Sequence, residues 1–369
     1  MFGQIYNKKK VLITGHTGFK GSWLSIWLKT LGAEVVGVSI EPPSIPNIFE
    51  VTNLKEKIID LRINICSLKS LQNVIDNENP DFIFHLAAQP LVKESYAKPC
   101  NTFETNILGT ANILEAVRKV NKKCILILIT SDKCYLNKEW EWGYRENDEL
   151  GGKDPYSASK ACAELIIKSM FNSYFENNEN IFIATARAGN VIGGGDWAPN
   201  RIVPDSIKAW EKKEKVLVRS PNSTRPWQHV LEPLSGYLLL GQALWNNKIK
   251  SGNAFNFGPK SDQIKTVIEL LKGLSKNWHD EKNQKYFIEI SENLGDIPQE
   301  AGLLKLNCDK ALTKINWKPV LEFEETMQFT TNWYKEYYLR KNRNMLDYSI
   351  DQIKYYTELA NSRNINWAK

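Results

Sequence analysis

The stretch "GHTGFKGSWL" at residues 15–24 follows an apolar run at residues 10–14 and opens a segment with helical periodicity. Three glycines spaced three apart, Gly15, Gly18 and Gly21, connect the two. A turn from strand to helix presents free backbone N–H groups and the positive end of the helix dipole, which together attract a dinucleotide pyrophosphate. We expect Gly15 to permit a tight turn, Gly18 to let the phosphates approach closely, and Gly21 to allow close helix–sheet packing.

The first half of the chain alternates short apolar runs with helical patterns. The runs lie at residues 10–14, 33–40, 57–63, 81–87 and 124–131 and are rich in β-branched or aromatic side chains. They are too continuously apolar for half-exposed strands, which favours a parallel sheet covered on both faces. Gly32 is placed to end the first helix, and Ser67 to cap the helix that begins at Leu68. This alternation predicts a doubly wound, Rossmann-like α/β fold.

The rhythm loosens after Gly189, where loops and mixed elements follow. We assign residues 1–188 to a dinucleotide-binding domain, with residues 228–260 returning to it, and residues 189–227 and 261–369 to a smaller substrate lobe. A strand at 215–219, a helix at 231–244, a strand at 253–258 and a helix at 265–276 are expected. From Glu322 onward two amphipathic helices are expected, and their aromatic residues Trp333, Tyr334 and Tyr337 should pack in a core.

Composition narrows the class of protein. With 369 residues, 42% of them hydrophobic, the chain can bury a large core. Its six cysteines show neither CxxC nor zinc spacing, so we expect free thiols in a reducing cytosol and no metal site. The absence of a signal-peptide pattern and of 18 consecutive apolar residues predicts a cytoplasmic protein with no membrane partner. The net charge of +6 is dispersed, which argues against nucleic-acid binding.

Two acidic residues mark the second and third predicted strands: Glu41 stands at the end of the second, and Asp60 lies in the third. Glu41 is placed to bind the adenosine ribose hydroxyls and to repel a 2′-phosphate, which favours NAD over NADP. Asp60 is either a ligand of the adenine or an ordinary strand-end acid. His16 and Lys20, in the glycine turn, are candidates for contact with phosphate.

The motif "YSASK" places Tyr156 and Lys160 four residues apart, on one face of a helix. A tyrosine phenol with a pKa of about 10 is a poor base at neutral pH, and a neighbouring ammonium group favours the phenolate. The fifth predicted strand ends in "TSDKCY", which supplies Ser131, Asp132 and Lys133. Doubly wound folds bind ligands at the carboxyl ends of their strands, so these five residues are expected to share one site.

Several motifs together resemble the extended short-chain dehydrogenases/reductases: GxxGxxG, "HLAAQ" at residues 85–89, the hydroxyl after the fifth strand, and YxxxK. More narrowly, five stretches are similar to the CDP-glucose 4,6-dehydratases: "GHTGFKGSWL", "TSDKCY", "GGGDW" at 193–197, "RPWQHV" at 225–230 and "WGYRENDELGGKDPYSASKACAEL" at 142–165. The resemblance is strong over residues 10–259 and weak in the C-terminal lobe. It implies a cofactor site formed by Glu41, Asp60, Tyr156, Lys160, Gly15, Thr17, Gly18, Phe19, Gly21, Leu86, Ala87 and Ala88.

The resemblance also implies a reaction, the NAD-dependent dehydration of a CDP-hexose, CDP-glucose, to a 4-keto-6-deoxy sugar. Tyr156 would take the proton from O4 while hydride passes to NAD, and the hydride would later return to C6. Ser131 would hydrogen-bond O4, and Lys160 would also hold the nicotinamide ribose. Asp132 would protonate the departing 6-hydroxyl, and Lys133 would remove the C5 proton, which requires its neutral form.

Other residues are expected around this centre. Gln89 and Glu94 would flank the sugar, and Asn190, Arg219, Arg225 and His229 are candidate ligands of the diphosphate and cytidine. His85 is expected to be a buried structural residue, and Cys134 to serve packing. The resemblance further implies a homodimer that pairs helices near Ile107 and Ser157.

Two alternative functions remain open besides a dehydratase for another nucleotide sugar. A sugar-nucleotide 4-epimerase would share the fold and the Tyr156–Lys160 pair, but it needs no acid and base for C5 and C6, so Asp132 and Lys133 argue against it. A non-catalytic NAD-binding protein would not need Tyr156 and Lys160, and the presence of both argues against that alternative.

Overall fold

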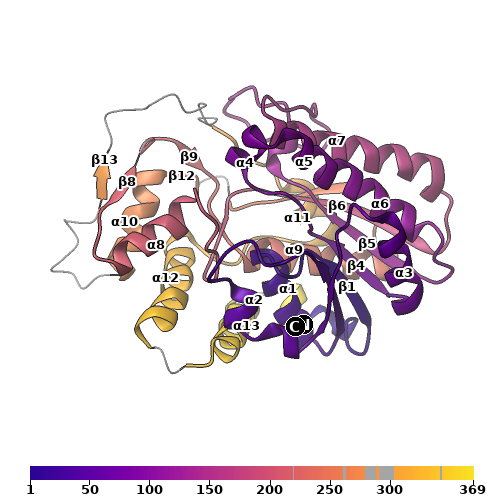
Figure 1. The fold of residues 1–369 in the computed structure, drawn as a ribbon, viewed down its shortest axis with the longest axis horizontal. Helices are drawn as coiled ribbons and strands as arrows, with labels where there is room; N and C mark the ends of the chain where they lie inside the picture. Colours follow the sequence, from indigo (N-terminus) through magenta and orange to yellow (C-terminus); the bar gives the residue numbers. More distant parts are fainter. Residues whose placement is uncertain (219, 261–262, 279–287, 291–302, 341–342) are drawn as a thin grey trace.

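A seven-stranded parallel sheet forms the centre of the computed structural model, which describes all residues except 219, 261–262, 279–287, 291–302 and 341–342 (Figure 1). Its strands are β1 (Lys10–Thr14), β2 (Glu34–Ser39), β3 (Ile59–Arg62), β4 (Phe82–His85), β5 (Cys124–Ile129), β6 (Ile181–Ala188) and β11 (Asn253–Phe257). Their order is β11-β6-β5-β4-β1-β2-β3. The order reverses between β1 and β4, which confirms the predicted doubly wound fold. Such a reversal is the point at which doubly wound folds generally bind their ligands.

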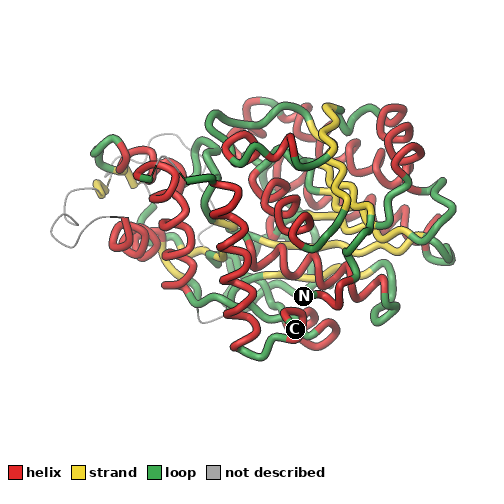
Figure 2. Tube along the Cα trace, turned by 90° about the horizontal axis from the view of Figure 1, so that it is seen from below, coloured by secondary structure: helices red, strands yellow, loops and turns green. Residues whose placement is uncertain are grey.

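The sheet is covered by helices on both faces, as Figure 2 shows. Alternate residues of the strands point to opposite sides: Val11 and Ile13 belong to one core and Leu12 to the other. Burial on both sides explains the continuous apolar runs in the sequence. The first core includes α1 (Phe19–Thr30), α9 (Leu231–Trp245) and α13 (Met345–Ser362); the second includes α3 (Leu68–Glu78), α6 (Gly109–Val117) and α7 (Pro155–Met170).

Local signals set the ends of several helices as predicted. Gly32, with φ of +80°, follows the C-cap of α1, and the Ser67 hydroxyl accepts the backbone N–H of Ser70 at the start of α3. The short helices α2 (Ile48–Val51), α4 (Val92–Ala97) and α5 (Pro99–Phe103) lie within the first half of the chain. None of the helices in the described part of the chain is long and apolar enough to cross a lipid bilayer.

The remaining elements form a smaller region beside the sheet (Figure 1). Three two-stranded pairs occur there: β7 (Val191–Ile192) with β10 (Gln228–His229), β8 (Val216–Val218) with β13 (Ile288–Ile290), and β9 (Thr224–Arg225) with β12 (Lys265–Thr266). The helices of this region are α8 (Ile202–Glu211), α10 (Val267–Trp278) and α12 (Phe323–Leu339), whereas α11 (Asp309–Ile315) lies against β11 and α9. The expected aromatic core is present, because Trp333 and Tyr334 of α12 are fully buried.

Two features differ from the pattern read in the sequence. β6 lies between β11 and β5 in the sheet, and none of the apolar runs predicted as strands covers it. α11 packs against β11 and α9, and α13 packs against α1, although the residues of both helices fall in the range assigned to the smaller lobe. The chain ends lie side by side (Figures 1 and 2), and the ring of Phe2 stacks on Trp367 with centroids 5.0 Å apart.

Candidate functional site

The three glycines of the first turn differ in what a side chain at each position would meet. Gly15 has φ of +79°, and a Cβ there would lie 2.7 Å from the backbone nitrogen of Ala87. A Cβ at Gly21 would collide with the carbonyl group of Gly15, so the close packing is between helix and turn rather than between helix and sheet. At Gly18 a Cβ would meet only the Gly15 oxygen at an ordinary 3.4 Å, which leaves space in front of the turn.

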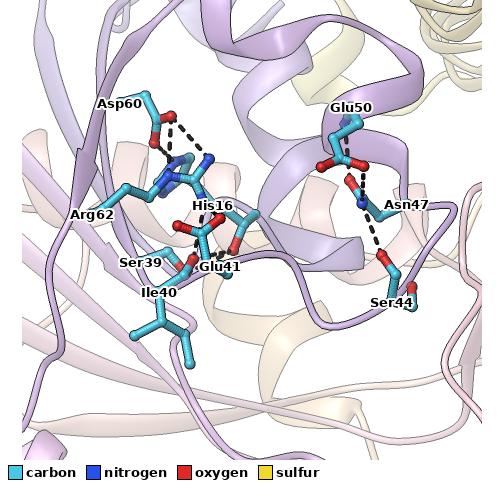
Figure 3. Close-up of polar contacts among 10 residues, drawn as sticks. His16, Ser39, Ile40, Glu41, Ser44, Asn47, Glu50, Asp60 and Arg62 are labelled. Atoms are coloured by element: carbon cyan, nitrogen blue, oxygen red, sulfur yellow. Dashed lines mark hydrogen bonds and ion pairs between the residues drawn. The ribbon is translucent and has the colours of Figure 1, made fainter.

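Residues at the end of β2, after β2 and within β3 form a polar cluster beside the turn (Figure 3). β2 ends at Ser39, two residues before Glu41, whose exposed carboxylate lies 3.4 Å from Nη1 of Arg62. Asp60 is buried and is held by His16 and Arg62. The Thr17 hydroxyl lies 2.8 Å from that of Ser39.

His16 is a structural residue in this arrangement. Its side chain is fully buried, and its Nε2 lies 2.8 Å from Oδ1 of Asp60. The ring packs edge-on against Phe49, and a side chain at Gly37 of β2 would collide with it. Burial lowers the pKa of His16 despite the opposing effect of Asp60. These contacts do not support the expected contact of His16 with phosphate.

The carboxyl end of β5 carries a compact polar cluster in a 3₁₀ turn at Asp132–Cys134. The Ser131 hydroxyl donates to Oδ1 of Asp132 at 2.9 Å and accepts the backbone N–H of Lys133 at 3.3 Å. Asp132 is only 1% exposed, and its Oδ2 has no hydrogen-bond partner within the described residues. A Cβ at Gly189 would collide with this carboxylate, so glycine is required where β6 ends.

Tyr156 and Lys160 lie on the first turns of α7, which begins with Asp154 as N-cap and Pro155 at its first position. Both side chains are buried. Burial raises the pKa of Tyr156 to about 12; Ser131 and Arg201 lower it and Asp132 raises it further. The expected downward shift of this pKa is wrong for this structure, because desolvation of the phenolate outweighs the nearby positive charges. Burial also lowers the pKa of Lys160, to about 8.

A buried ion pair fixes α7 against the sheet. Nε and Nη2 of Arg187, in β6, donate to the two carboxylate oxygens of Glu164, both at 2.8 Å. The hydroxyl of Thr130, at the end of β5, donates to Glu164 at 2.5 Å. Glu164 lies one turn after Lys160, so this network sets the position of the lysine relative to the end of β5.

Three further residues lie near this centre: Lys20, which was expected to contact phosphate, and Tyr237 and Arg201, which no motif indicated. Lys20 donates from its amine to the hydroxyl of Tyr237, in α9, at 3.3 Å. Burial lowers the pKa of Lys20 to about 7, helped by the charges of Lys160 and Arg201 and opposed by Asp132. Arg201 is paired with Asp196 at 2.9 Å. The sequence signal for Arg201 was its place five residues after Asp196, in the loop that follows "GGGDW".

The "GGGDW" loop itself is held from two distant parts of the chain. Nε1 of Trp23, in α1, donates to the carbonyl oxygen of Gly194 at 2.9 Å. A side chain at Gly194 would collide with the ring of Trp333, in α12. Nε1 of Trp197 donates to the hydroxyl of Tyr338 at 2.9 Å. The position of Asp196, and with it of Arg201, therefore depends on both helices.

The candidates expected near the sugar are engaged in local contacts. The Gln89 amide donates to the carbonyl oxygen of Leu91 at 3.1 Å and to the hydroxyl of Thr102 at 2.8 Å. Glu94 forms an ion pair with Lys98, one turn along α4. Gln89 directly follows the predicted cofactor residues Leu86, Ala87 and Ala88 after β4, and Glu94 lies in α4.

The candidates expected near the nucleotide differ in their surroundings. Asn190 is half-buried with φ of +44°, and Arg225 is buried with its Nη1 donating to the Thr224 carbonyl oxygen at 2.8 Å. His229 is fully buried between Trp23 and Phe329, and burial lowers its pKa to about 3, which does not support a role as phosphate ligand. Arg219 lies outside the described residues.

His85 and Cys134 are buried as expected. Nδ1 of His85 lies 2.8 Å from the Thr14 hydroxyl, and burial lowers its pKa to about 3. Cys134 is fully buried, and all six cysteines are free. No group of three or more metal-ligating side chains occurs in the described parts of the chain. The site thus combines a glycine turn at the start of α1 with a buried hydroxyl, phenol, amine and carboxyl group, which suits hydride transfer coupled to proton transfer.

Comparison with known proteins agrees with this geometry. The sequence profile of the family described as "GDP-mannose 4,6 dehydratase" matches residues 12–330. CDP-glucose 4,6-dehydratase of Salmonella typhimurium is 44% identical over 331 residues, which cover 89% of this chain and 90% of that protein. UDP-glucose 4-epimerase of Mycoplasma pneumoniae is 25% identical over 346 residues, which cover 90% of this chain and 98% of that protein.

Solved structures show the same fold. The dTDP-glucose 4,6-dehydratase of Bacillus anthracis, in complex with NAD, has a TM-score of 0.71 at 20% identity and covers 89% of this chain and 97% of its own. UDP-glucuronic acid 4-epimerase of Bacillus cereus, in complex with UDP-glucuronic acid and NAD, has a TM-score of 0.74 at 21% identity, covering 89% and 99%. The matched family profile, the 44% identical relative and the shared fold lead to one conclusion: the chain belongs to the sugar-nucleotide 4,6-dehydratases of the extended short-chain dehydrogenase/reductase group.

Proposed function

We propose that this protein is an NAD-dependent CDP-glucose 4,6-dehydratase. The observation that carries the proposal is the grouping of Ser131 and Asp132, at the end of β5, with Tyr156 of α7. Lys160 follows one turn later on the same helix, and Lys133 follows Asp132 in the same 3₁₀ turn. The similarity to the Salmonella typhimurium enzyme supports the choice of CDP-glucose. The product would be the CDP-4-keto-6-deoxy sugar and water.

The residues present fit a dinucleotide. The turn at Gly15–Gly21 has space in front of Gly18, and the N-terminus of α1 presents its free N–H groups there. When bound, NAD would accept a hydride during oxidation and return it at the end of the cycle. Glu41, beside the expected ribose, favours NAD over NADP.

The chain's own residues would handle the protons. Tyr156 would take the proton from O4 of the sugar, and Ser131 would hydrogen-bond the same oxygen. Because Tyr156 is buried and its pKa is high, oxidation depends on positive charge near the phenol, which Arg201 supplies. Asp132 would give a proton to the departing 6-hydroxyl, and Lys133 would remove the proton from C5.

The remaining assignments follow the same proposal. Asn190 and Arg225 would contact the nucleotide diphosphate, and Gln89 and Glu94 would lie at the edge of the sugar. We also propose a cytoplasmic homodimer. The pairing would use the helical segments near Ile107 and Ser157. Leu108 (47% exposed) and Leu165 on α7 (55% exposed) support it, because each offers an apolar side chain on the surface there.

A sugar-nucleotide 4-epimerase is the second candidate, because epimerases share the fold. Isotope routing separates the two functions. CDP-glucose deuterated at C4 is expected to give a product with deuterium at C6 and no net NADH, because one hydride leaves and returns to different carbons. Mass and NMR analysis of the product measure this, in a panel with dTDP-, GDP- and UDP-glucose. Deuterium that returns to C4 would identify an epimerase, and label lost to solvent would contradict the dehydratase.

Gly189→Ala is expected to lower turnover at least tenfold. The new methyl group would displace the Asp132 carboxylate, so the proton for the 6-hydroxyl would be misplaced while oxidation at C4 continued. Single-turnover absorbance at 340 nm measures the transient reduced cofactor, which should accumulate. Gly258→Ala is the matched control, because a Cβ there meets only ordinary contacts beyond 3.5 Å. Unchanged turnover in Gly189→Ala would contradict the role given to Asp132.

A further inference from the structure

Arg62, the last residue of β3, is held firmly at the edge of the proposed adenosine site (Figure 3). Its Nε and Nη2 both donate to Oδ2 of Asp60, at 3.1 and 3.0 Å. Its guanidinium carbon lies 5.0 Å from the centre of the Phe49 ring. Because Asp60 is buried and also bound by His16, the position of Arg62 is fixed from the protein interior.

The other side of the guanidinium faces the residues that follow β2. Nη1 donates to the carbonyl oxygen of Ile40 at 3.1 Å and to Oε2 of Glu41 at 3.4 Å. The Thr17 hydroxyl, from the glycine turn, donates to the same Ile40 oxygen at 3.2 Å. Arg62 therefore lies where the ends of β2 and β3 meet the turn, the edge at which a dinucleotide places its adenosine ribose.

The two acids around Arg62 differ in strength of attachment. Asp60 is buried and accepts two hydrogen bonds from the guanidinium, whereas the Glu41 side chain is 82% exposed and makes one long contact. Exposed ion pairs of this kind contribute little, about 0–1 kcal/mol. An acid beside the ribose disfavours a 2′-phosphate, and an arginine there accommodates one. This site contains both, and only the acid is loosely held.

We propose that Arg62 is a latent ligand for the 2′-phosphate of an adenosine cofactor, and that Glu41 masks it. Cofactor selectivity then depends on the Glu41–Arg62 pair rather than on Glu41 alone. The inference rests on the dinucleotide site of the proposed function. Once Glu41 loses its charge, the guanidinium stays in place through Asp60 and Phe49 and offers Nη1 to a phosphate.

The test compares two ligands that differ only by a 2′-phosphate, 5′-AMP and adenosine 2′,5′-bisphosphate. Their binding to the full-length protein is measured by isothermal titration calorimetry. Wild type is expected to prefer 5′-AMP. Glu41→Gln should improve binding of the bisphosphate at least tenfold and change binding of 5′-AMP less than threefold. In the double variant Glu41→Gln/Arg62→Met the gain should disappear.

Glu34→Gln is the matched control, because it removes one exposed carboxylate at the opposite end of β2. It should leave the ratio of the two affinities unchanged. Absence of a gain in Glu41→Gln, or a gain that persists without Arg62, would overturn the inference while the proposed function stands. Wild type that binds neither ligand nor NAD would instead overturn the proposed cofactor site. Glu41 is exposed, so the decisive single variant does not depend on tolerance of a core substitution.

Discussion

Tyr156→Phe is expected to lower turnover by on the order of 10²–10⁴-fold, the usual contribution of a positioned acid or base. Without the phenol nothing accepts the O4 proton, so hydride cannot leave C4 and no reduced cofactor forms, even transiently. Stopped-flow absorbance at 340 nm in a single turnover with CDP-glucose measures this directly.

The variant should keep its fold and its ligand affinity. Tyr156 is buried, but the loss of one hydroxyl changes little volume, and binding of CDP-glucose should remain within a few-fold of wild type. Tyr174→Phe, at a tyrosine that is half exposed, is the matched control and should retain full activity. A burst of reduced cofactor in Tyr156→Phe would show that another group removes the O4 proton.

Lys133→Met is expected to block the reaction at a later step, again by on the order of 10²–10⁴-fold. Oxidation at C4 should proceed because Tyr156 and Lys160 are intact, but the C5 proton should stay in place. The signature is reduced cofactor that accumulates on the enzyme, without exchange of C5–H in deuterated solvent measured by NMR.

Two comparisons make this result specific. Lys153→Met, at an exposed lysine of the loop before α7, should behave as wild type. Near-normal turnover of Lys133→Met would show that Lys133 is not the C5 base. The buried amine of Lys20, bonded to Tyr237 close to Asp132, would then be the next residue to substitute.

The sequence predicts the sheet well where local patterns suffice. The run at residues 10–14 became β1 with the same bounds, and Gly32 ended α1 as its position indicated. β6 was not predicted as a strand, because its apolar pattern is interrupted by a stretch of small and polar residues, Ala184, Thr185, Ala186 and Arg187. The charge of Arg187 is tolerated in a central strand only because Glu164, on α7, pairs with it. That partner is 23 residues away along the chain, beyond the reach of a local pattern.

The site shows the same division. Residue type and spacing identify Tyr156, Lys160 and Asp132, because neighbouring positions on one helix or turn must lie together. The direction of the Tyr156 pKa was predicted wrongly, since burial arises from packing by distant elements. His16 and His229 were expected to contact a ligand. Their own motifs do not show that Asp60 binds His16 or that Phe329 packs against His229, because both neighbours come from distant parts of the chain.

The anchoring of the "GGGDW" loop limits how freely this enzyme can be recombined with its relatives. Trp23, near the start of the chain, donates a hydrogen bond to Gly194, and the ring of Trp333, in α12, packs against the same residue. Trp197 donates a hydrogen bond to Tyr338, which is also in α12. A chimera that exchanges only the segment around Arg201 would therefore receive a loop shaped for different helices. The shape of this loop therefore depends on three separate segments, so an engineer who transplants the loop must transfer α1 and α12 together with it.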